Sequence, residues 1–219
     1  MKIATILPYK ENYTLNGAGA VSLWIKDFLR DSNYKKNIIV FGSTNKKKFL
    51  TKNYINIDID YNIINSKINS TTKEYSKKII EKINKRKFDI IELHNRPTMV
   101  DSFLKKTNSK IILYLHNDPR TMKGAKSVKE RIFLLKNVDK IIFISEWVKK
   151  KFFEGLPYLS KNKTQIIYHS IDPIKKNKKK LKKIIFVGKL NYSKGYDLFC
   201  RSVLTILNKY KDWRAISIG

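Results

Sequence analysis

Cysteine, histidine and acidic residues are scarce in this sequence, and it has no long apolar run. Cys200 is the single cysteine among 219 residues, which excludes an internal disulfide and any zinc site built from cysteines. No apolar stretch approaches the roughly 18 residues that span a bilayer. The apolar start of the chain is too short for a signal peptide, and Pro8 interrupts it. We therefore expect a cytoplasmic protein.

The shortage of acidic residues leaves the chain strongly positive. There are 47 Lys and Arg residues against 18 Asp and Glu, a formal net charge of +29. Seven of the lysines lie within residues 175–183, so most of the excess is spread along the chain. Such a charge is typical of proteins that bind an anionic membrane or nucleic acid, and biased codon usage rich in Lys, Asn, Ile and Tyr gives the same result. Because no helix-turn-helix, zinc-finger or RNA-recognition motif is present, we expect no nucleic-acid partner.

Short runs rich in Ile and Val alternate with longer amphipathic segments along the first 170 residues. The predicted strands cover residues 2–7, 38–41, 54–59, 89–93, 111–115, 141–144 and 165–168. The predicted helices cover residues 18–30, 100–106 and 146–153, and two more follow capping boxes at 71–74 and 127–130. Uninterrupted apolar runs are typical of strands buried on both faces. The pattern predicts an α/β fold, a Rossmann-like parallel sheet with helices on both faces.

A second domain begins after a basic linker. Residues 1–172 form the predicted N-terminal domain, and the lysine-rich residues 173–183 are too charged to pack. Residues 184–219 then offer a strand at 184–187, a helix at 195–210 and a strand at 215–218. A doubly wound sheet usually has about five or six strands. We therefore expect only the start of a second Rossmann-like domain here.

All three histidines of the chain follow predicted strands. His94, His116 and His169 come after the strands at 89–93, 111–115 and 165–168. Ligands of open α/β sheets bind at the carboxyl ends of the strands. A single histidine at such a place is often structural, but three together favour a binding site.

Two glycine-containing loops lead from a strand into a helix, as in sites for phosphate groups. The first contains Gly17 and Gly19, whose lack of a side chain lets backbone N–H groups approach a ligand. It is not a complete dinucleotide fingerprint, because Ser22 replaces the third glycine. The second loop contains Gly188, Lys189 and Lys194, which together suit a diphosphate.

These motifs, taken in order, resemble family 4 of the retaining glycosyltransferases, which have two facing Rossmann-like domains (the GT-B fold). The resemblance covers nearly the whole chain. Besides the first glycine loop, it rests on residues 89–97 (DIIELHNRP), 115–119 (LHNDP), 144–148 (ISEWV), 167–172 (IYHSID), 186–190 (FVGKL) and 194–195 (KG). The sequences of residues 115–119 and 144–148 are similar to those of family members that build lipopolysaccharide or other envelope glycans.

The resemblance implies a reaction and a set of site residues. A sugar would pass from a nucleoside diphosphate to a hydroxyl of a glycan or lipid-linked acceptor with retention at the anomeric carbon, without a metal or another cofactor. His116 would lie at the transfer centre, and Gly188, Lys189 and Lys194 would hold the donor diphosphate. The family usually has arginine at the position of Lys189, so the two-pronged grip is lost there. The expected substrate-binding residues are Gly17, Gly19, His94, Asn95, Asn117, Asp118, Ser145 and His169.

Other interpretations stay open. One is a basic protein without catalysis that binds an anionic membrane surface or nucleic acid; another is a sugar-nucleotide epimerase of the same fold. Lys149–Lys151 beside Trp147, Phe152 and Phe153 would suit a peripheral contact with anionic lipid at the inner face of the membrane. Since the donor domain is expected to be incomplete, we expect the 219-residue chain alone to be inactive.

Two acidic pairs are interpreted as coincidences. Asp58 and Asp60 match the Asp-x-Asp of metal-dependent glycosyltransferases, but the context of that fold is missing. Glu146 and Glu154 have the spacing of the family's paired glutamates, yet they lie in the N-terminal domain, where that pair does not belong.

Overall fold

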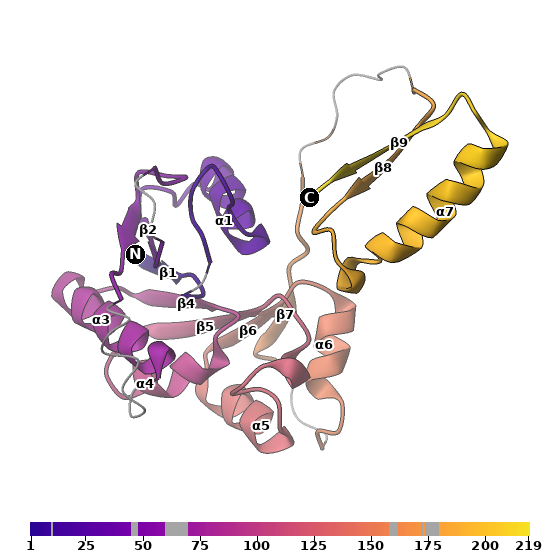
Figure 1. Cartoon of the computed structure of the whole chain (residues 1–219). Coiled ribbons are helices and arrows are strands. Elements are labelled where there is room, and N and C mark those ends of the chain that lie inside the picture. Colours follow the sequence, from indigo (N-terminus) through magenta and orange to yellow (C-terminus); the bar gives the residue numbers. More distant parts are fainter. Residues whose placement is uncertain (10, 45–47, 60–69, 158–161, 172, 174–179) are drawn as a thin grey trace. The chain divides into compact units, whose positions relative to one another are not determined.

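The computed structural model describes residues 1–9, 11–44, 48–59, 70–157, 162–171, 173 and 180–219. The chain divides into two compact units, Met1–Ser170 and Ile171–Gly219, each with its own sheet (Figure 1). The division lies two residues before the predicted end of the N-terminal domain. Residues 174–179 of the predicted linker lie outside the described residues.

The N-terminal unit is built on a parallel sheet whose strands, within the described residues, have the order β3-β2-β1-β4-β5-β6-β7. These strands are β1 (Ile3–Ile6), β2 (Ile38–Gly42), β3 (Tyr54–Asn56), β4 (Ile90–His94), β5 (Lys110–Leu115), β6 (Lys140–Phe143) and β7 (Thr164–Ile166). Every pairing between neighbouring strands is parallel. The carboxyl ends therefore meet at one edge, and the predicted Rossmann-like sheet is confirmed.

Helices follow the strands and pack on both faces of the sheet. They are α1 (Ala20–Asp31), α3 (Thr71–Arg86), α4 (Val100–Leu104), α5 (Val128–Asn137) and α6 (Glu146–Phe153), with the 3-10 helices η1 (Pro97–Met99) and η2 (Pro119–Thr121). The capping box predicted at the start of α5 is confirmed, because Ser127 and Glu130 each accept the other's backbone N–H. The one predicted at 71–74 is wrong by one residue. Ser70 is the cap of α3, and its hydroxyl accepts the N–H of Lys73 at 3.2 Å.

The two faces of this sheet differ in what covers them. Among the described helices of this unit, α1 is the one that packs on one face, where its Val21, Ile25 and Leu29 join buried residues of β1 and β2 (Figure 1). α3, α4, α5 and α6 cover the other face, and their apolar side chains join Ile91 and Leu93 of β4 in the larger core. Because side chains alternate along a strand, neighbouring residues of β4 and β5 face different helices. This alternation places the functional side chains described below.

The C-terminal unit has the order strand, helix, strand. β8 (Lys183–Val187) pairs in parallel with β9 (Arg214–Ile218), and α7 (Tyr196–Lys209) connects them after the 3-10 helix η3 (Tyr192–Lys194). The three predicted elements of this region are thus present, with ends shifted by one residue or none. Ile185 and Val187 of β8 are exposed, and Val203 of α7 is the one buried apolar side chain in the described part of this unit.

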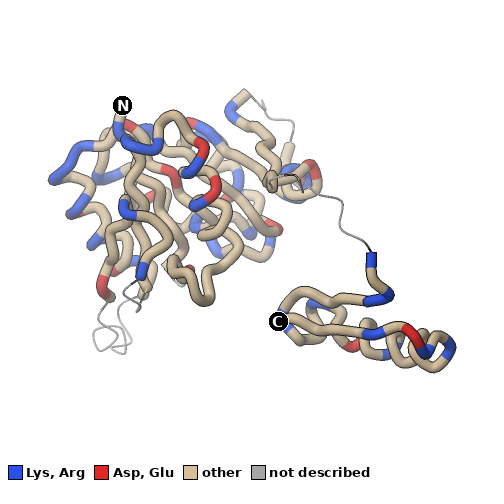
Figure 2. The backbone as a smooth tube through the Cα atoms, turned by 90° about the horizontal axis from the view of Figure 1, so that it is seen from above, with Lys and Arg blue, Asp and Glu red and all other residues tan. Residues whose placement is uncertain are grey.

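Positive charge is distributed over both units. Figure 2 shows Lys and Arg along most segments of the backbone, with few Asp and Glu between them. This agrees with the excess being a property of the whole chain. Across the residues that the structure covers, no helix combines the length and apolarity needed to cross a bilayer.

Candidate functional site

Three histidines form a hydrogen-bonded chain at the carboxyl edge of the N-terminal sheet. His94 Nδ1 lies 2.9 Å from His116 Nε2, and His116 Nδ1 lies 3.2 Å from His169 Nε2. His94 and His116 are buried, whereas His169 is exposed. The three histidines that follow predicted strands therefore lie together at this edge, and their use as a substrate-binding site stays a prediction.

The direction of this chain follows from its buried end. His94 Nε2 is buried and has no hydrogen-bond partner in the described residues. A proton there would leave a buried N–H without an acceptor, which proteins avoid. The proton of His94 therefore belongs on Nδ1 and is donated to His116, which donates in turn from Nδ1 to His169. All three rings are then neutral.

Burial keeps the rings neutral. It lowers the pKa of His94 well below the ordinary value, and repulsion from a charged His116 would lower it further. Burial lowers the pKa of His116 to about 3, with His169 contributing. The partial burial of His169 lowers its pKa as well. Both ring nitrogens of His116 are engaged inside the protein, so in this state the ring offers no free nitrogen to a substrate, and a catalytic role of His116 stays a prediction.

An aromatic side chain from α1 covers the histidine chain. The ring of Trp24 stacks on His169 at a centroid distance of 5.1 Å and meets His94 and His116 at 5.7 and 5.6 Å. Trp24 also contacts Tyr114, whose ring stacks on His94 at 4.5 Å. The sequence pattern showed Trp24 only as one apolar residue of a helix, so its place at the site was missed.

A half-buried carboxyl group lies on the same face of the sheet. Glu92 interrupts the apolar run of β4, and it accepts hydrogen bonds from Thr5 Oγ1 at 2.6 Å and Tyr114 OH at 3.4 Å. Burial raises the pKa of Glu92, and the two hydrogen bonds lower it in part. The signal for this residue was an acid within a strand buried on both faces, which the prediction did not use.

Asn95 joins this face to the opposite one. Its backbone has φ 53°, in the left-handed region that asparagine tolerates better than most residues. Its N–H donates to Tyr114 O at 2.9 Å, and its Oδ1 accepts the N–H of His116 at 2.7 Å. These bonds continue the pairing of β4 and β5 beyond the strands and fix the position of His116.

A polar pocket of about 690 Å³ opens beside Asn95, over the ends of β4 and β5. Asn95 and Asn117 line it, and each directly follows a histidine of the chain. The other lining residues are Tyr9, Ser70, Thr72, Lys73, Ser76, Arg96, Pro97, Thr98, Ser102, Thr121, Met122 and Lys123. The start of α3, η1, α4 and the loop after η2 therefore surround the pocket.

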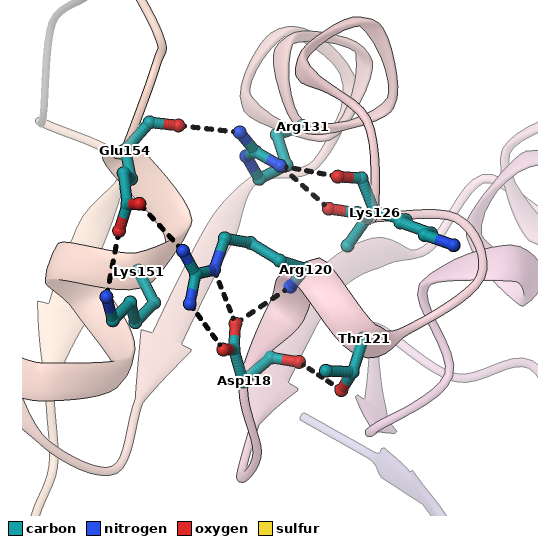
Figure 3. Close-up of polar contacts among 8 residues, drawn as sticks. Asp118, Arg120, Thr121, Lys126, Arg131, Lys151 and Glu154 are labelled. Carbon is teal, nitrogen blue, oxygen red and sulfur yellow. Dashed lines mark hydrogen bonds and ion pairs between the residues drawn. The ribbon is translucent and has the colours of Figure 1, made fainter.

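Two of the predicted substrate-binding residues hold local structure instead of pointing at a free space. Asp118 caps η2 and accepts hydrogen bonds from the backbone and guanidinium of Arg120, which also pairs with Glu154 at 2.7 Å (Figure 3). These contacts lower the pKa of the Asp118 carboxyl. Ser145 caps α6, and its hydroxyl accepts the N–H of Val148 at 3.2 Å. A direct contact of either with a substrate stays a prediction.

The first glycine loop already faces an anion of its own chain. Glu11 Oε1 accepts the N–H of Ser22 at 3.2 Å, at the start of α1. A Cβ on Gly19 would collide with the Glu11 carboxylate, so Gly19 makes room for this contact. Gly17, at φ 88°, has the left-handed backbone that favours glycine, and its carbonyl accepts from Asn12. A phosphate approaching this helix end would meet a carboxylate, which the sequence did not reveal.

The second glycine loop lies in the C-terminal unit. Lys189 and Lys194 are exposed, and Gly188 has φ 151°, within the range that favours glycine. The turn is held by Asn191, whose Oδ1 accepts the N–H of Lys194 at 3.2 Å. The structure thus gives the predicted loop between β8 and α7, while its use for a diphosphate stays a prediction.

The two acidic pairs behave as surface residues where they are described. Asp58 accepts a hydrogen bond from Asn56, and Asp60 lies outside the described residues. Glu146 and Glu154 are exposed, and Glu154 pairs with Arg120 and Lys151. In the described segments, no three His, Cys, Asp or Glu side chains form a group that could hold a metal ion.

Comparison with known proteins identifies the family of this fold and site. The model of Glycosyltransferase Family 4 matches residues 17–175, which is more than half of the chain and includes all three histidines. The chain belongs to Glycosyltransferase Family 4. The resemblance carried by the strand-end motifs is therefore confirmed.

Individual relatives agree with this membership. YtcC of Bacillus subtilis (strain 168), a glycosyltransferase by name, is 29% identical over 160 residues, which are 64% of this chain and 39% of YtcC. Anabaena HepE in complex with UDP-glucose has a TM-score of 0.60 and 11% identity over 100% of this chain and 69% of that chain. A glycosyltransferase from Rickettsia africae ESF-5 has a TM-score of 0.62 and 14% identity, covering 100% of this chain and 68% of that one. At these identities the structures show the fold, which is of the GT-B type.

Proposed function

We propose that this family 4 protein transfers a sugar from a nucleoside diphosphate sugar to a hydroxyl acceptor, with retention at the anomeric carbon, in the synthesis of an envelope glycan. The observation that carries the proposal is the family match over residues 17–175, which includes the histidine chain and the polar pocket at one sheet edge. Because this chain spans 39% of YtcC, the activity is proposed for the whole protein. The UDP-glucose bound by HepE supports a nucleotide-sugar donor.

The proposed reaction needs one bond to break and one to form. The bond between the anomeric carbon and the diphosphate oxygen breaks, and the acceptor oxygen bonds to the same face of that carbon. The acceptor proton passes to the departing phosphate oxygen, and the nucleoside diphosphate leaves. The protein positions the reactants and stabilises the charge that grows on the diphosphate.

The residues divide this work between the two units. The neutral histidine chain would orient the donor sugar through its exposed member, His169, and through the backbone carbonyl of His116, without adding positive charge of its own. Lys189 and Lys194 would contact the diphosphate, where a charge-assisted hydrogen bond is stronger than a neutral one. No metal and no other cofactor takes part in this proposal, so chelation by EDTA should leave the rate unchanged.

The test is sugar transfer by the protein expressed from its entire gene. We expect release of nucleoside diphosphate that depends on the acceptor, a product with the donor's anomeric configuration, and a loss of about 100-fold in kcat for His116→Ala. Nucleotide sugar that is converted without any acceptor would indicate an epimerase, and an inverted product would contradict retention. We expect residues 1–219 alone to transfer no sugar.

We also propose a peripheral contact with anionic membrane, made by fewer residues of α6 than the sequence predicts. Phe152 of α6 is buried, so it is unavailable to lipid, and Lys151 pairs with Glu154 and lies over the ring of Trp147. Trp147 and Lys150 are exposed and remain suited to a membrane surface. Trp147→Ala combined with Lys150→Gln should weaken binding to vesicles containing phosphatidylserine, and unchanged binding would contradict the contact.

A further inference from the structure

The pocket at the ends of β4 and β5 has an uneven charge. Lys73, Arg96 and Lys123 are among its lining residues, and none of the lining residues that the structure describes is Asp or Glu. Three cations around one space repel each other when the space holds only water, and a bound anion would relieve the repulsion. The local absence of acids matters because the strand ends nearby do contain them, in Glu92 and Asp118.

Arg96 is the half-buried cation of the three, and its side-chain contacts are with uncharged groups. Its Nη1 donates to Asn95 O at 2.9 Å, and the guanidinium lies 5.4 Å from the centroid of the Tyr9 ring. It forms no ion pair with any acid in the part of the chain that the structure covers. Its Nε is buried without a hydrogen-bond partner among the described residues. A half-buried guanidinium held by a neighbouring carbonyl and a ring, without an acid, suits an anion that arrives with a ligand.

The remaining lining groups supply donors for the rest of such a ligand. Lys73 and Lys123 are exposed at the rim, and neither has an ion pair within the described residues. The hydroxyls of Thr72, Thr98 and Ser102 likewise have no hydrogen-bond partner there. Since Thr72 is in the first turn of α3, the positive end of that helix dipole adds to the attraction for an anion.

The wall opposite α3 is held rigid by contacts outside the pocket. Arg131 donates to the carbonyls of Lys126 and Glu154, each within 2.8 Å, and Arg120 joins Asp118 to Glu154 (Figure 3). Gly124 fits directly against the backbone of Thr98, because a Cβ there would lie 2.7 Å from the Thr98 nitrogen. The loop that carries Lys123 is therefore positioned before a ligand binds, which lowers the entropy cost of binding.

We infer that this pocket binds the acceptor, and that the acceptor is a hydroxyl compound carrying a phosphate monoester. The inference rests on the proposed function, because it names the acceptor of that reaction. A phosphate monoester carries about −1.5 to −2 charges at neutral pH, which matches three cations better than a single carboxylate does. The lining hydroxyls and the amides of Asn95 and Asn117 bind the sugar or polyol part.

The experiment measures binding by the 219-residue chain without any donor. Glucose 6-phosphate, glucose, glucuronate and inorganic phosphate are titrated by calorimetry at constant ionic strength. Glucose 6-phosphate is expected to bind at least about tenfold more tightly than glucose, since loss of a charge-assisted hydrogen bond costs about tenfold or more. Arg96→Gln and the double variant Lys73→Gln/Lys123→Gln should each remove about tenfold or more of the glucose 6-phosphate affinity.

The matched control is Lys82→Gln, an exposed lysine on α3 outside the pocket. It removes the same charge from the same helix and should change the dissociation constant by less than about twofold. Equal weakening by the control and the pocket variants would overturn the inference. So would glucose or inorganic phosphate binding as tightly as glucose 6-phosphate, and equal affinity for glucuronate would overturn the assignment of phosphate. The double variant changes only exposed lysines, so it serves if Arg96→Gln does not fold.

Failure of the proposed function would give a different result. In that case glucose 6-phosphate would still bind in a manner sensitive to Lys73 and Lys123, while the whole protein would consume no nucleotide sugar. Failure of the inference alone would appear as sugar transfer by the whole protein to neutral acceptors at rates that phosphate on the acceptor does not raise.

Discussion

The strands of the two units have similar apolar sequences but differ in exposure. Ile91 in β4 is 0% exposed, whereas Ile185 in β8 is 53% exposed. The difference comes from the layers around each sheet. Helices lie on both faces of the N-terminal sheet, while α7 is the helix that accompanies β8 and β9 in the described part of the C-terminal unit. An Ile-rich strand thus indicates where burial is available, and the number of covering layers decides whether it occurs.

The first prediction breaks this comparison at one matched pair of residues. Ile91→Ala should lower the free energy of unfolding by about 2–5 kcal/mol, because it removes buried methyl groups and leaves a cavity. Ile185→Ala should change it by less than about 0.5 kcal/mol, since the side chain is exposed. Urea unfolding followed by circular dichroism measures both. Equal losses for the two variants would mean that β8 is covered in solution.

The second prediction uses the histidines, all of which lie in the N-terminal unit. In the unfolded chain His116 takes up a proton near its ordinary pKa of 6.5, whereas in the folded chain its pKa is about 3. The unfolded state therefore binds more protons at mildly acidic pH, and stability falls as pH falls below about 6.5. The loss from His116 is about 2 kcal/mol between pH 6.5 and 5. The pKa of Glu92 is raised in the fold, so at lower pH its protonation increases stability and opposes part of this loss.

Urea midpoints measured across this pH range check the second prediction. The variant His116→Asn should show a shallower decline in stability than the wild type, whatever its stability at pH 7.5. The C-terminal unit, which contains no histidine, should not contribute to the slope. A slope unchanged in the variant would show that His116 is protonated in the folded protein.

The third and smallest effect compares the glycines that begin α1 and α7. Gly195 has φ 73°, so Gly195→Ala should cost about 1–2 kcal/mol in the C-terminal unit. Gly19 has φ −77°, which any residue adopts, and Gly19→Ala displaces only the end of the flexible Glu11 side chain. Its cost should be about 0.3–1 kcal/mol, the value of an acid at a helix start. Amide hydrogen exchange measures the loss for Gly195→Ala in α7 and the loss for Gly19→Ala in α1.

Adding Glu11→Gln gives the control for the third prediction. Glu11→Gln and Gly19→Ala disturb the same contact, so the double variant should lose less than the sum of the two single losses. Full additivity would show that the carboxylate and Gly19 act independently.

The fold was predictable because its signals are local in the chain. The Ile and Val runs of β4 and β5 and the Ser127 capping box each specify structure within a few residues. The histidines could be assigned to one sheet edge because parallel strands end together. What the sequence did not reveal depends on contacts between distant segments. Trp24 reaches the histidines only when α1 is packed, and Glu11 meets α1 only through the path of its loop.

The charge of the site was also beyond the sequence pattern. In a chain with 47 Lys and Arg residues, no single cation stands out, and Arg96 is distinguished in the sequence only as part of the motif at residues 89–97. Its significance appears once the described lining residues of the pocket are known, because none of them is an acid. The sequence likewise did not show that Asp118, a predicted substrate-binding residue, pairs with Arg120. That contact forms because η2 turns Arg120 toward Asp118.

Asn95 contacts both the histidine chain and the pocket. Its carboxamide fixes the backbone of His116 on the α1 side, while the residue lines the pocket on the α3 side. Any ligand that shifts Asn95 must therefore also change the magnetic surroundings of the His116 ring. The imidazole NMR resonances of His116 should therefore report whether the pocket is occupied. This readout needs neither a donor nor a reaction.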